Sequence, residues 1–452
     1  SKKDQKLIKQ FNDILNKLSH ASISENDRNE LILEKSFLEK KIYRLLPKLN
    51  FEIVDSKIIS KKLPLKSILI EYQKYSPYQP LSESGEIWGA PRYVALILYN
   101  DGQSKSFDLG LSLPIDKKIQ KALAASEKGL EDAQDLWNDV GKLIIYPLKN
   151  LLGDSDTLFI SPDAGLNRVP FSAISSHRED QLLGDAVKIR ILTTGRELLN
   201  LAKSSKSNKQ KTLVVANPAF NLNKTFRSKK TIELIASKQS QKRSGDLDLF
   251  KWDPLPGTAK EGKIVAELTN AQLLTKNEAT ALALQERKAP KILHIASHAY
   301  YLPDQENGEN PLLRSGIVLA GANDPETNPK DDGYLTALEV AKVDWQGTEL
   351  VVISACESGK GDIQSGEGVY GLKRAIAVAG ARSSLLSLWK VDDIATADFM
   401  EKFYQKLKDG MGRSEALAET QKEFKNHSIT RFRHPYYWAA FQLSGDWRPI
   451  DF

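Results

Sequence analysis

Two residues able to do covalent chemistry together each follow a short apolar segment of the chain. His298 comes just after the segment KILHIA, and Cys356, the only cysteine, directly follows the segment ELVVISA. In open α/β sheets, reactive groups collect beyond the carboxyl ends of the strands. If the two segments are neighbouring strands, we expect both side chains at the same edge of the sheet. A thiolate is a strong nucleophile and a histidine can protonate a leaving amine, so this pair suits acyl transfer.

An inert core residue is the alternative interpretation of Cys356, because buried cysteines usually behave as small hydrophobic side chains. The residues that follow argue against it. The segment CESGKGDIQSGEG is polar and rich in glycine, which is typical of an exposed loop with room for a ligand.

The composition narrows the classes of protein that the chain can belong to. Its 452 residues, 41% hydrophobic and 27% charged, are typical of a soluble globular protein of one to three domains. One cysteine excludes a disulfide framework and a multi-cysteine zinc site. With 64 basic and 58 acidic residues, the surface is mixed, and nucleic acid is an unexpected partner. We expect no metal, no cofactor, no membrane span and, without a signal-peptide core, a cytoplasmic location.

Hydrophobic periodicity predicts three regions. Apolar residues spaced by three and four predict two helices, at 3–20 and about 28–46, which form a helical hairpin within residues 1–60. Such a hairpin is compatible with the end of a helical-repeat array. Residues 65–205 predict a smaller α/β unit. From 211 to 452, short apolar strands alternate with helices, which favours a parallel-rich α/β sheet flanked by helices.

Motifs from about residue 65 to the C-terminus occur in an order that resembles a known family. They include WGAPRYVALIL, FISPDAGLNRVPF, LPGTAKE, HIASHA, SGIVLAGAND, DGYLTALEV, LVVISACESGKG, GEGVYGLKRAIAVAGA, SLWKVDDIATADFM and HPYYWAAFQLSGDW. In this order they resemble the CHAT-domain family of caspase-like (clan CD) cysteine peptidases. The segment SLWKVDD is also similar to the separase catalytic region.

The resemblance implies a cysteine endopeptidase with His298 and Cys356 as its dyad. Caspases have their histidine roughly 50 residues before the cysteine, and the separation here is similar. The resemblance also implies an oxyanion hole formed by the backbone N–H groups of Ala299 and Cys356, where caspases have glycine at the first position. Residues 65–205 would then be an inactive caspase-like domain, in which Asp163 shapes a loop, and 211–452 the active protease domain.

An acidic S1 pocket, which binds the residue before the scissile bond (P1), is a further implication. Asp393 matches the separase aspartate that holds a P1 arginine, and Asp392 is its neighbour. A carboxylate in a partly closed pocket binds arginine bidentately and favours it over lysine. Either aspartate could instead cap the helix expected from 394, and we assign the cap to Asp392. The expected partners are a protein substrate with a basic P1 residue and a regulatory protein bound through the N-terminal helices.

Three motifs suggest other kinds of site. The segment GEGVYG, 366–371, fits the dinucleotide pattern but does not follow its strand directly, and its glycines fit tight turns near a substrate backbone. His294 and His298 have the spacing of a helical zinc pair, but they lie on a strand, so His294 is expected to be a core residue. The acidic segment 324–333 lacks the EF-hand ligand order, so it is not expected to be a calcium loop, and calcium binding elsewhere in the chain stays open.

The stretch 222–243 is rich in lysine and arginine and nearly lacks aromatic residues. A nucleic-acid patch is one interpretation, and a solvated loop is a simpler one. A peptidase specific for basic residues could also cut itself there, with Arg227 and Arg243 as candidate sites. A non-catalytic peptide-binding module on the same scaffold stays open as the alternative to the enzyme.

Overall fold

The computed structural model describes most of the chain from residue 54 onward. The described ranges are 54–80, 87–178, 180–202, 210–222, 251–301, 314–325, 331–357 and 367–452, with Leu312 and isolated residues before 54. The chain divides into two compact units, and the larger one comprises 55–219, 254–320 and 333–452. In the smaller unit, the described residues of both expected N-terminal helices are helical, and Ile14 and Leu38 among them are buried.

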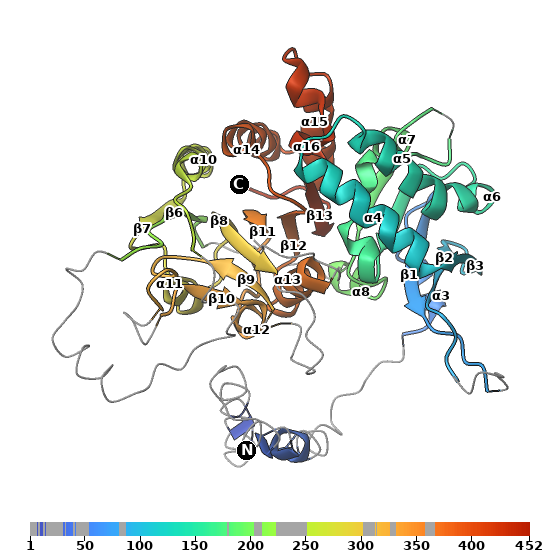
Figure 1. Ribbon diagram of the computed structural model, residues 1–452, viewed down its shortest axis with the longest axis horizontal. Helices are drawn as coiled ribbons and strands as arrows, with labels where there is room; N and C mark the ends of the chain where they lie inside the picture. The colour runs from blue at the N-terminus through green and yellow to red at the C-terminus, as the bar shows by residue number, and fades with distance from the viewer. Residues whose placement is uncertain are drawn as a thin grey trace. The chain divides into compact units, whose positions relative to one another are not determined.

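The larger unit is built on one 13-stranded sheet, shown in Figure 1. Its strands are short and mostly rich in β-branched and other apolar residues, which suit a buried sheet. They are β1 (Ser67–Tyr75), β2 (Arg92–Tyr99), β3 (Ser104–Leu111), β4 (Thr157–Ser161), β5 (Lys188–Ile191), β6 (Leu213–Pro218), β7 (Gln272–Lys276), β8 (Ile292–Tyr301), β9 (Ser315–Val318), β10 (Tyr334–Thr336), β11 (Leu350–Glu357), β12 (Ser383–Ser387) and β13 (Phe441–Gly445).

The strands form two parallel blocks that run in opposite directions. The order is β10-β9-β8-β11-β12-β13-β5-β4-β1-β2-β3, and β6 pairs with both β7 and β8. The first block contains β1, β4, β5 and β13, and the second contains β6, β7, β8, β11 and β12. They meet where β12 pairs antiparallel with β13. The expected α/β class, with a parallel-rich sheet flanked by helices, is confirmed.

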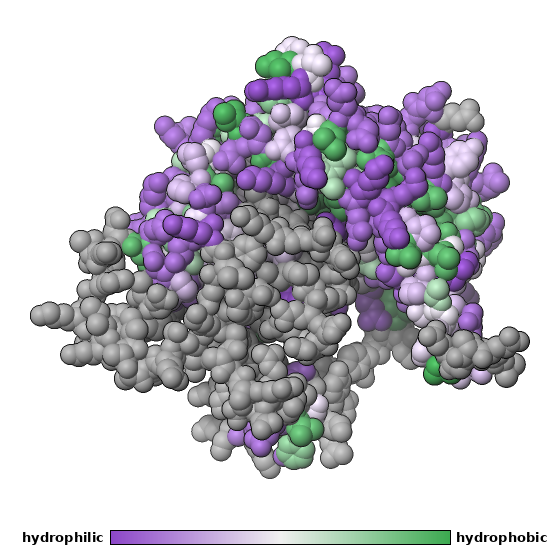
Figure 2. Space-filling model, in the orientation of Figure 1, coloured by the Kyte–Doolittle hydropathy of each residue, from purple (hydrophilic) through white to green (hydrophobic). Residues whose placement is uncertain are grey.

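Helices cover both faces of the second block (Figure 1). On one side lie α10 (Pro256–Thr269), α14 (Asp393–Lys408) and α15 (Arg413–Lys425), and on the other lie α11 (Ala281–Gln285), α12 (Ala337–Val340) and α13 (Glu367–Val378). Further helices are α3 (Ser56–Ser60), α4 (Ser112–Glu127), α5 (Ala133–Ile144), α6 (Lys149–Leu152), α7 (Leu183–Ala186), α8 (Glu197–Leu201) and α16 (Pro435–Trp438). On the face in Figure 2, the described surface is mostly hydrophilic with scattered hydrophobic residues.

A single residue pair, Ser444–Ile191, joins β13 to β5. All other neighbouring strands of the described sheet pair over three or more residues. We call this junction the seam. Residues from 65–205 and from 211–452 therefore share one sheet, and the identity of the first region as an inactive copy of the fold stays a prediction.

Two element boundaries differ from what the sequence pattern predicts. The pattern predicts one helix at 129–152, but Pro147 cannot donate a helical N–H bond, and this stretch forms α5, a 3-10 turn and α6. The pattern also predicts a loop at 300–312, whereas Tyr300 and Tyr301 belong to β8. Strands β5, β10 and β13 had no clear sequence signal, since each is only three to five residues long.

Candidate active site

His298 and Cys356 are register partners on neighbouring parallel strands. The ladder between β8 and β11 runs from Ile292 opposite Leu350 to Ala299 opposite Glu357, and it pairs His298 with Cys356. The two residues therefore lie side by side at the carboxyl edge of the second block, where ligands of α/β sheets bind. The position of the Cys356 side chain lies outside the described part of the structure.

His298 occupies a point where the neighbour of β8 changes. On that side, β6 pairs with Leu293–Ala296, and β9 pairs with His298–Tyr301. The strand therefore does not end before His298, as the sequence suggested, but continues beyond it. His298 and Ala299 are both buried, with 4% and 2% of their surface exposed. Their backbones are held on both sides, by β11 and by β9, which fixes the main chain at the edge.

The two adjacent aspartates at the start of α14 have different environments. The Asp392 carboxylate accepts hydrogen bonds from the N–H groups of Ile394 (3.1 Å) and Ala395 (2.9 Å), so the expected helix cap is confirmed. Asp393 is half-buried instead and is the first residue of α14. The same sequence therefore supplies one aspartate to the helix and leaves the other facing a cavity.

A small cavity lies between β11, β12, α10 and α14. Its volume is about 10 Å³, which is room for about one water molecule. Ser354, which lies two residues before Cys356, is one of its lining residues. The full lining is Thr258, Glu261, Ser354, Ser387, Val391, Asp393, Thr396 and Phe441. Asp393 therefore faces a cavity beside the candidate dyad, but the cavity is closed to a large side chain.

Asp393 is held against the first turn of α10. The backbone N–H of Gly257 donates to its carboxylate, and a Cβ added at Gly257 would clash with the Cβ of Asp393. Burial raises the pKa of Asp393 above its ordinary value, and the negative charge of Glu261 raises it further. This carboxylate is thus partly desolvated and close to a second carboxylate.

A buried polar group that sequence reasoning missed lies behind the cavity. Glu261 Oε1 is 3.0 Å from His294 Nε2, and His294 Nδ1 is 3.1 Å from the Tyr404 hydroxyl. All three side chains are buried, so the expectation of His294 as a core residue is confirmed. The available signal was the position of Glu261 one turn before Val265, on the apolar face of α10.

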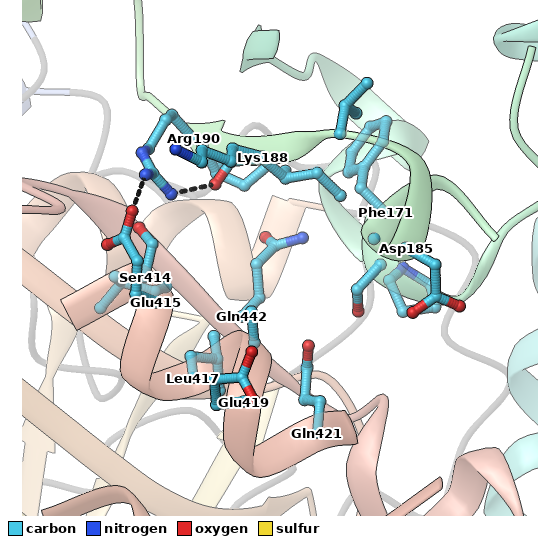
Figure 3. A pocket seen from close by; sticks show the side chains of 18 of the residues that line it. Phe171, Asp185, Lys188, Arg190, Ser414, Glu415, Leu417, Glu419, Gln421 and Gln442 are labelled. Carbon is cyan, nitrogen blue, oxygen red and sulfur yellow. Dashed lines mark hydrogen bonds and ion pairs between the residues drawn. The ribbon is translucent and has the colours of Figure 1, made fainter. Parts of the chain in front are cut away.

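A much larger cavity, of about 420 Å³, lies at the seam (Figure 3). Residues of β5, β13, α7 and α15 line it, and His298, Cys356 and Asp393 do not. At its rim the Arg190 guanidinium forms an ion pair with Glu415 and donates to the Ile189 carbonyl at 3.2 Å. Phe441 lines both this cavity and the small one. Size alone therefore does not identify the candidate site.

The acidic residues at the carboxyl ends of the first block are occupied by loop contacts. Asp163 Oδ2 accepts the Lys74 N–H at 2.9 Å, and Glu71 Oε1 accepts the Gly195 N–H at 2.6 Å. Asp163 therefore ties its own loop to β1, and its role in an inactive domain stays a prediction.

The other motifs do not form a site in the described structure. Residues 367–371 of the glycine-rich segment are helical, so the expected tight turns at Gly368 and Gly371 are wrong. Residues 223–243, with Arg227 and Arg243, lie outside the described residues. Within the described ranges, no three histidine, cysteine or acidic residues gather as metal ligands, and no helix is both long and apolar enough to cross a membrane.

The solved structures that are similar to this chain include the following two. One is the Saccharomyces cerevisiae separase–securin complex, with 11% identity, a TM-score of 0.46, and 97% of this chain and 33% of that chain covered. The other is the Arg-specific cysteine proteinase gingipain R, with 10% identity, a TM-score of 0.38, and 75% of each chain covered.

Two curated relatives and one family model match the sequence. Tetratricopeptide repeat protein 28 is 29% identical in Homo sapiens and 28% identical in Mus musculus, each over 224 residues. These matches cover 45% of this chain and 9% of each relative, so the chain matches only a small part of their length. The CHAT domain model matches residues 133–446, well over half of the sequence. The chain therefore belongs to the CHAT domain family.

Proposed function

We propose that this protein is a cysteine endopeptidase that cuts protein substrates after arginine and less readily after lysine. The observation that carries the proposal is the register that pairs His298 with Cys356 at the carboxyl edge of parallel strands. Membership of the CHAT domain family supports it. A cytoplasmic location belongs to the same proposal.

In the proposed mechanism, the Cys356 thiolate attacks the scissile carbonyl carbon and forms a tetrahedral oxyanion. The backbone N–H groups of Ala299 and Cys356 donate to that oxyanion. His298 gives a proton to the amine as the C–N bond breaks. Water then attacks the thioester, which releases the acid and regenerates the thiol.

Specificity for a basic P1 residue would come from Asp393 in the small cavity. A cavity of about 10 Å³ does not admit an arginine side chain, so α10 and α14 have to separate when substrate binds. A regulatory protein that binds the N-terminal helices is the proposed trigger for this opening.

The test is cleavage of a fluorogenic peptide that ends in arginine. We expect wild-type protein to release the fluorophore, and Cys356→Ala and His298→Ala to lose at least about 1,000-fold in kcat/KM, as expected when a nucleophile or its proton donor is removed. An arginyl chloromethyl ketone should label wild type and not Cys356→Ala. Thermal unfolding of all three proteins checks that they fold alike.

A non-catalytic module that grips basic peptides is the second candidate. The two curated relatives carry the name of a repeat protein and not of a peptidase, which favours this candidate. In this case neither turnover nor labelling would occur, and an arginine peptide would bind wild type and Cys356→Ala equally.

Self-cleavage at Arg227 or Arg243 is part of the proposal for the enzyme. Intact-mass analysis of active protein should show two fragments that end at one of these residues. One uncut species in an active preparation would rule self-cleavage out.

A further inference from the structure

Two carboxylates from different helices line the small cavity next to the candidate dyad. Asp393 comes from α14, and Glu261 comes from α10. Among the residues that the structure describes, the lining also includes four hydroxyl groups and no lysine, arginine or histidine; the hydroxyls belong to Thr258, Ser354, Ser387 and Thr396. The described part of the lining is therefore rich in acceptors of hydrogen bonds and without a cationic side chain.

The Glu261 carboxylate is buried, but one of its oxygens lacks a hydrogen bond among the described residues. Only 1% of its surface is exposed, and its Oε1 makes no hydrogen bond with any residue that the structure describes. His294 Nε2 lies 3.0 Å from this oxygen, but the pair lacks the alignment of a hydrogen bond. A buried carboxylate with an open acceptor is costly unless a cation or donor reaches it.

The two carboxylates also repel each other across the cavity. Burial, followed by the charge of Glu261, disfavours ionised Asp393. A cation placed between the two side chains removes this repulsion and supplies the missing donors. The cavity thus has the charge of a cation site before any ligand is present.

We propose that Glu261 is a specificity-determining residue that binds the P1 guanidinium together with Asp393. This inference rests on the proposed function. A guanidinium has five N–H donors in a fixed plane and can contact both carboxylates, whereas an ammonium is a compact point charge. The second carboxylate therefore explains a preference for arginine over lysine more fully than Asp393 alone. His294 and Tyr404 position Glu261 from behind.

The test compares Glu261→Gln with Glu267→Gln, a matched control on the exposed side of the same helix. Peptides with P1 arginine, lysine or citrulline, a neutral analogue of arginine, are the substrates. We expect Glu261→Gln to lower kcat/KM for arginine roughly 10- to 100-fold, mainly through KM, as for the loss of a hydrogen bond to a charged group. The arginine-to-lysine and arginine-to-citrulline ratios should fall, and Glu267→Gln should leave both unchanged.

The same variants in a Cys356→Ala background make the test independent of turnover. Binding of the arginine and citrulline peptides is measured by calorimetry, and Glu261→Asp, which keeps the charge, serves if Glu261→Gln does not fold. If Glu261→Gln weakens binding of the arginine peptide but wild type shows no turnover, the inference is supported and the peptidase proposal is wrong. If Glu261→Gln has the same turnover and the same arginine binding as wild type, the inference is wrong and the peptidase proposal stands. Neither binding nor turnover in wild type overturns both.

Discussion

Cys356 is the direct register partner of His298 across β11 and β8. Neighbouring strands lie about 5 Å apart, so the backbone alone brings the two residues together. Hydrogen bonds of the sheet fix the spacing of these two residues. Each strand is also paired on its other side, β11 with β12 and β8 with β6 and β9. Substitutions in surrounding loops should therefore change access to the site more than the spacing of its backbone.

Substitution of Asp392 should change stability, and substitution of Asp393 should change specificity. Asp392→Ala removes the helix cap and should lower the free energy of unfolding by about 1 kcal/mol, without changing the preference for P1 arginine. Asp393→Asn should do the reverse, lowering kcat/KM for arginine peptides with little change in stability. Chemical denaturation and P1 profiling of both variants measure this, and equal P1 profiles would contradict the assignment.

Gly257 should matter because Asp393 packs directly on its backbone. In Gly257→Ala the new methyl group clashes with Asp393 and has to displace it, so we expect a higher KM for arginine peptides. Lys260→Ala, an exposed change on the same helix, is the control. An unchanged KM in folded Gly257→Ala would show that the position of Asp393 is unimportant.

Lys373 predicts a specific dependence of stability on alkaline pH. This residue of α13 is buried, donates to Asn167 Oδ1 at 2.9 Å, and has its pKa lowered by burial from 10.5 to about 8. Between these values the unfolded chain binds more protons than the folded one, so this group makes the free energy of unfolding rise with pH from 8 to 10.5. Below pH 8 this lysine does not make the free energy of unfolding depend on pH.

Replacing the lysine checks this sign. The difference in free energy of unfolding between wild type and Lys373→Met should change with pH only across the window from 8 to 10.5. Lys408→Met, on the exposed end of α14, is the control and should show no such change. Parallel curves for wild type and Lys373→Met would contradict the buried, shifted lysine.

Asp446 should anchor the sheet at the edge far from the candidate dyad. Burial alone would raise its pKa, but hydrogen bonds from Arg448 and Arg382 and the charge of Arg413 bring it well below its ordinary value. Asp446→Asn removes one of the two carboxylates of this cluster, while Glu349 still pairs with Arg413 and Arg382, so the free energy of unfolding should fall by about 1–3 kcal/mol.

The acid side of the stability curve gives a second measurement on Asp446. Because its folded pKa is depressed, its contribution is complete above 3.8 and is lost as pH falls below that value. The variant should lose less stability than wild type across this range. P1 preference should stay unchanged, and a change in preference would mean that this edge communicates with the site.

The sequence was sufficient for the strands that carry the dyad. β8 and β11 are the longest strands of the second block and are rich in β-branched and apolar residues, so their presence could be found by pattern, although both continue past the point where the apolar run stops. Their pairing register could not, because it depends on hydrogen bonds between segments far apart in the chain. The prediction of a loop at Tyr300 is wrong for the same reason, because that residue belongs to a strand through its pairing with β9.

The cavity was predicted only in part. The cap at Asp392 could be predicted because aspartate commonly caps a helix start, whereas Asp393 was assigned only through the resemblance to separase. The buried position of Glu261 could not be predicted, because hydrophobic periodicity identifies apolar residues on a buried face and does not predict a charged residue there. The seam was also unpredictable, since the four-residue β5 has two basic residues among its apolar ones.

The reversal of direction between β12 and β13 has a consequence for communication within the fold. The carboxyl ends of the strands in the first block lie at the opposite edge of the sheet from the carboxyl ends near His298 and Cys356. A ligand bound at one set of carboxyl ends thus shares no rim with a ligand at the other. Residues 65–205 instead contact the second block through buried side chains, such as Asn167, whose Oδ1 accepts a hydrogen bond from Lys373 of α13 at 2.9 Å. An influence of the first region on the candidate dyad would pass through contacts of this kind.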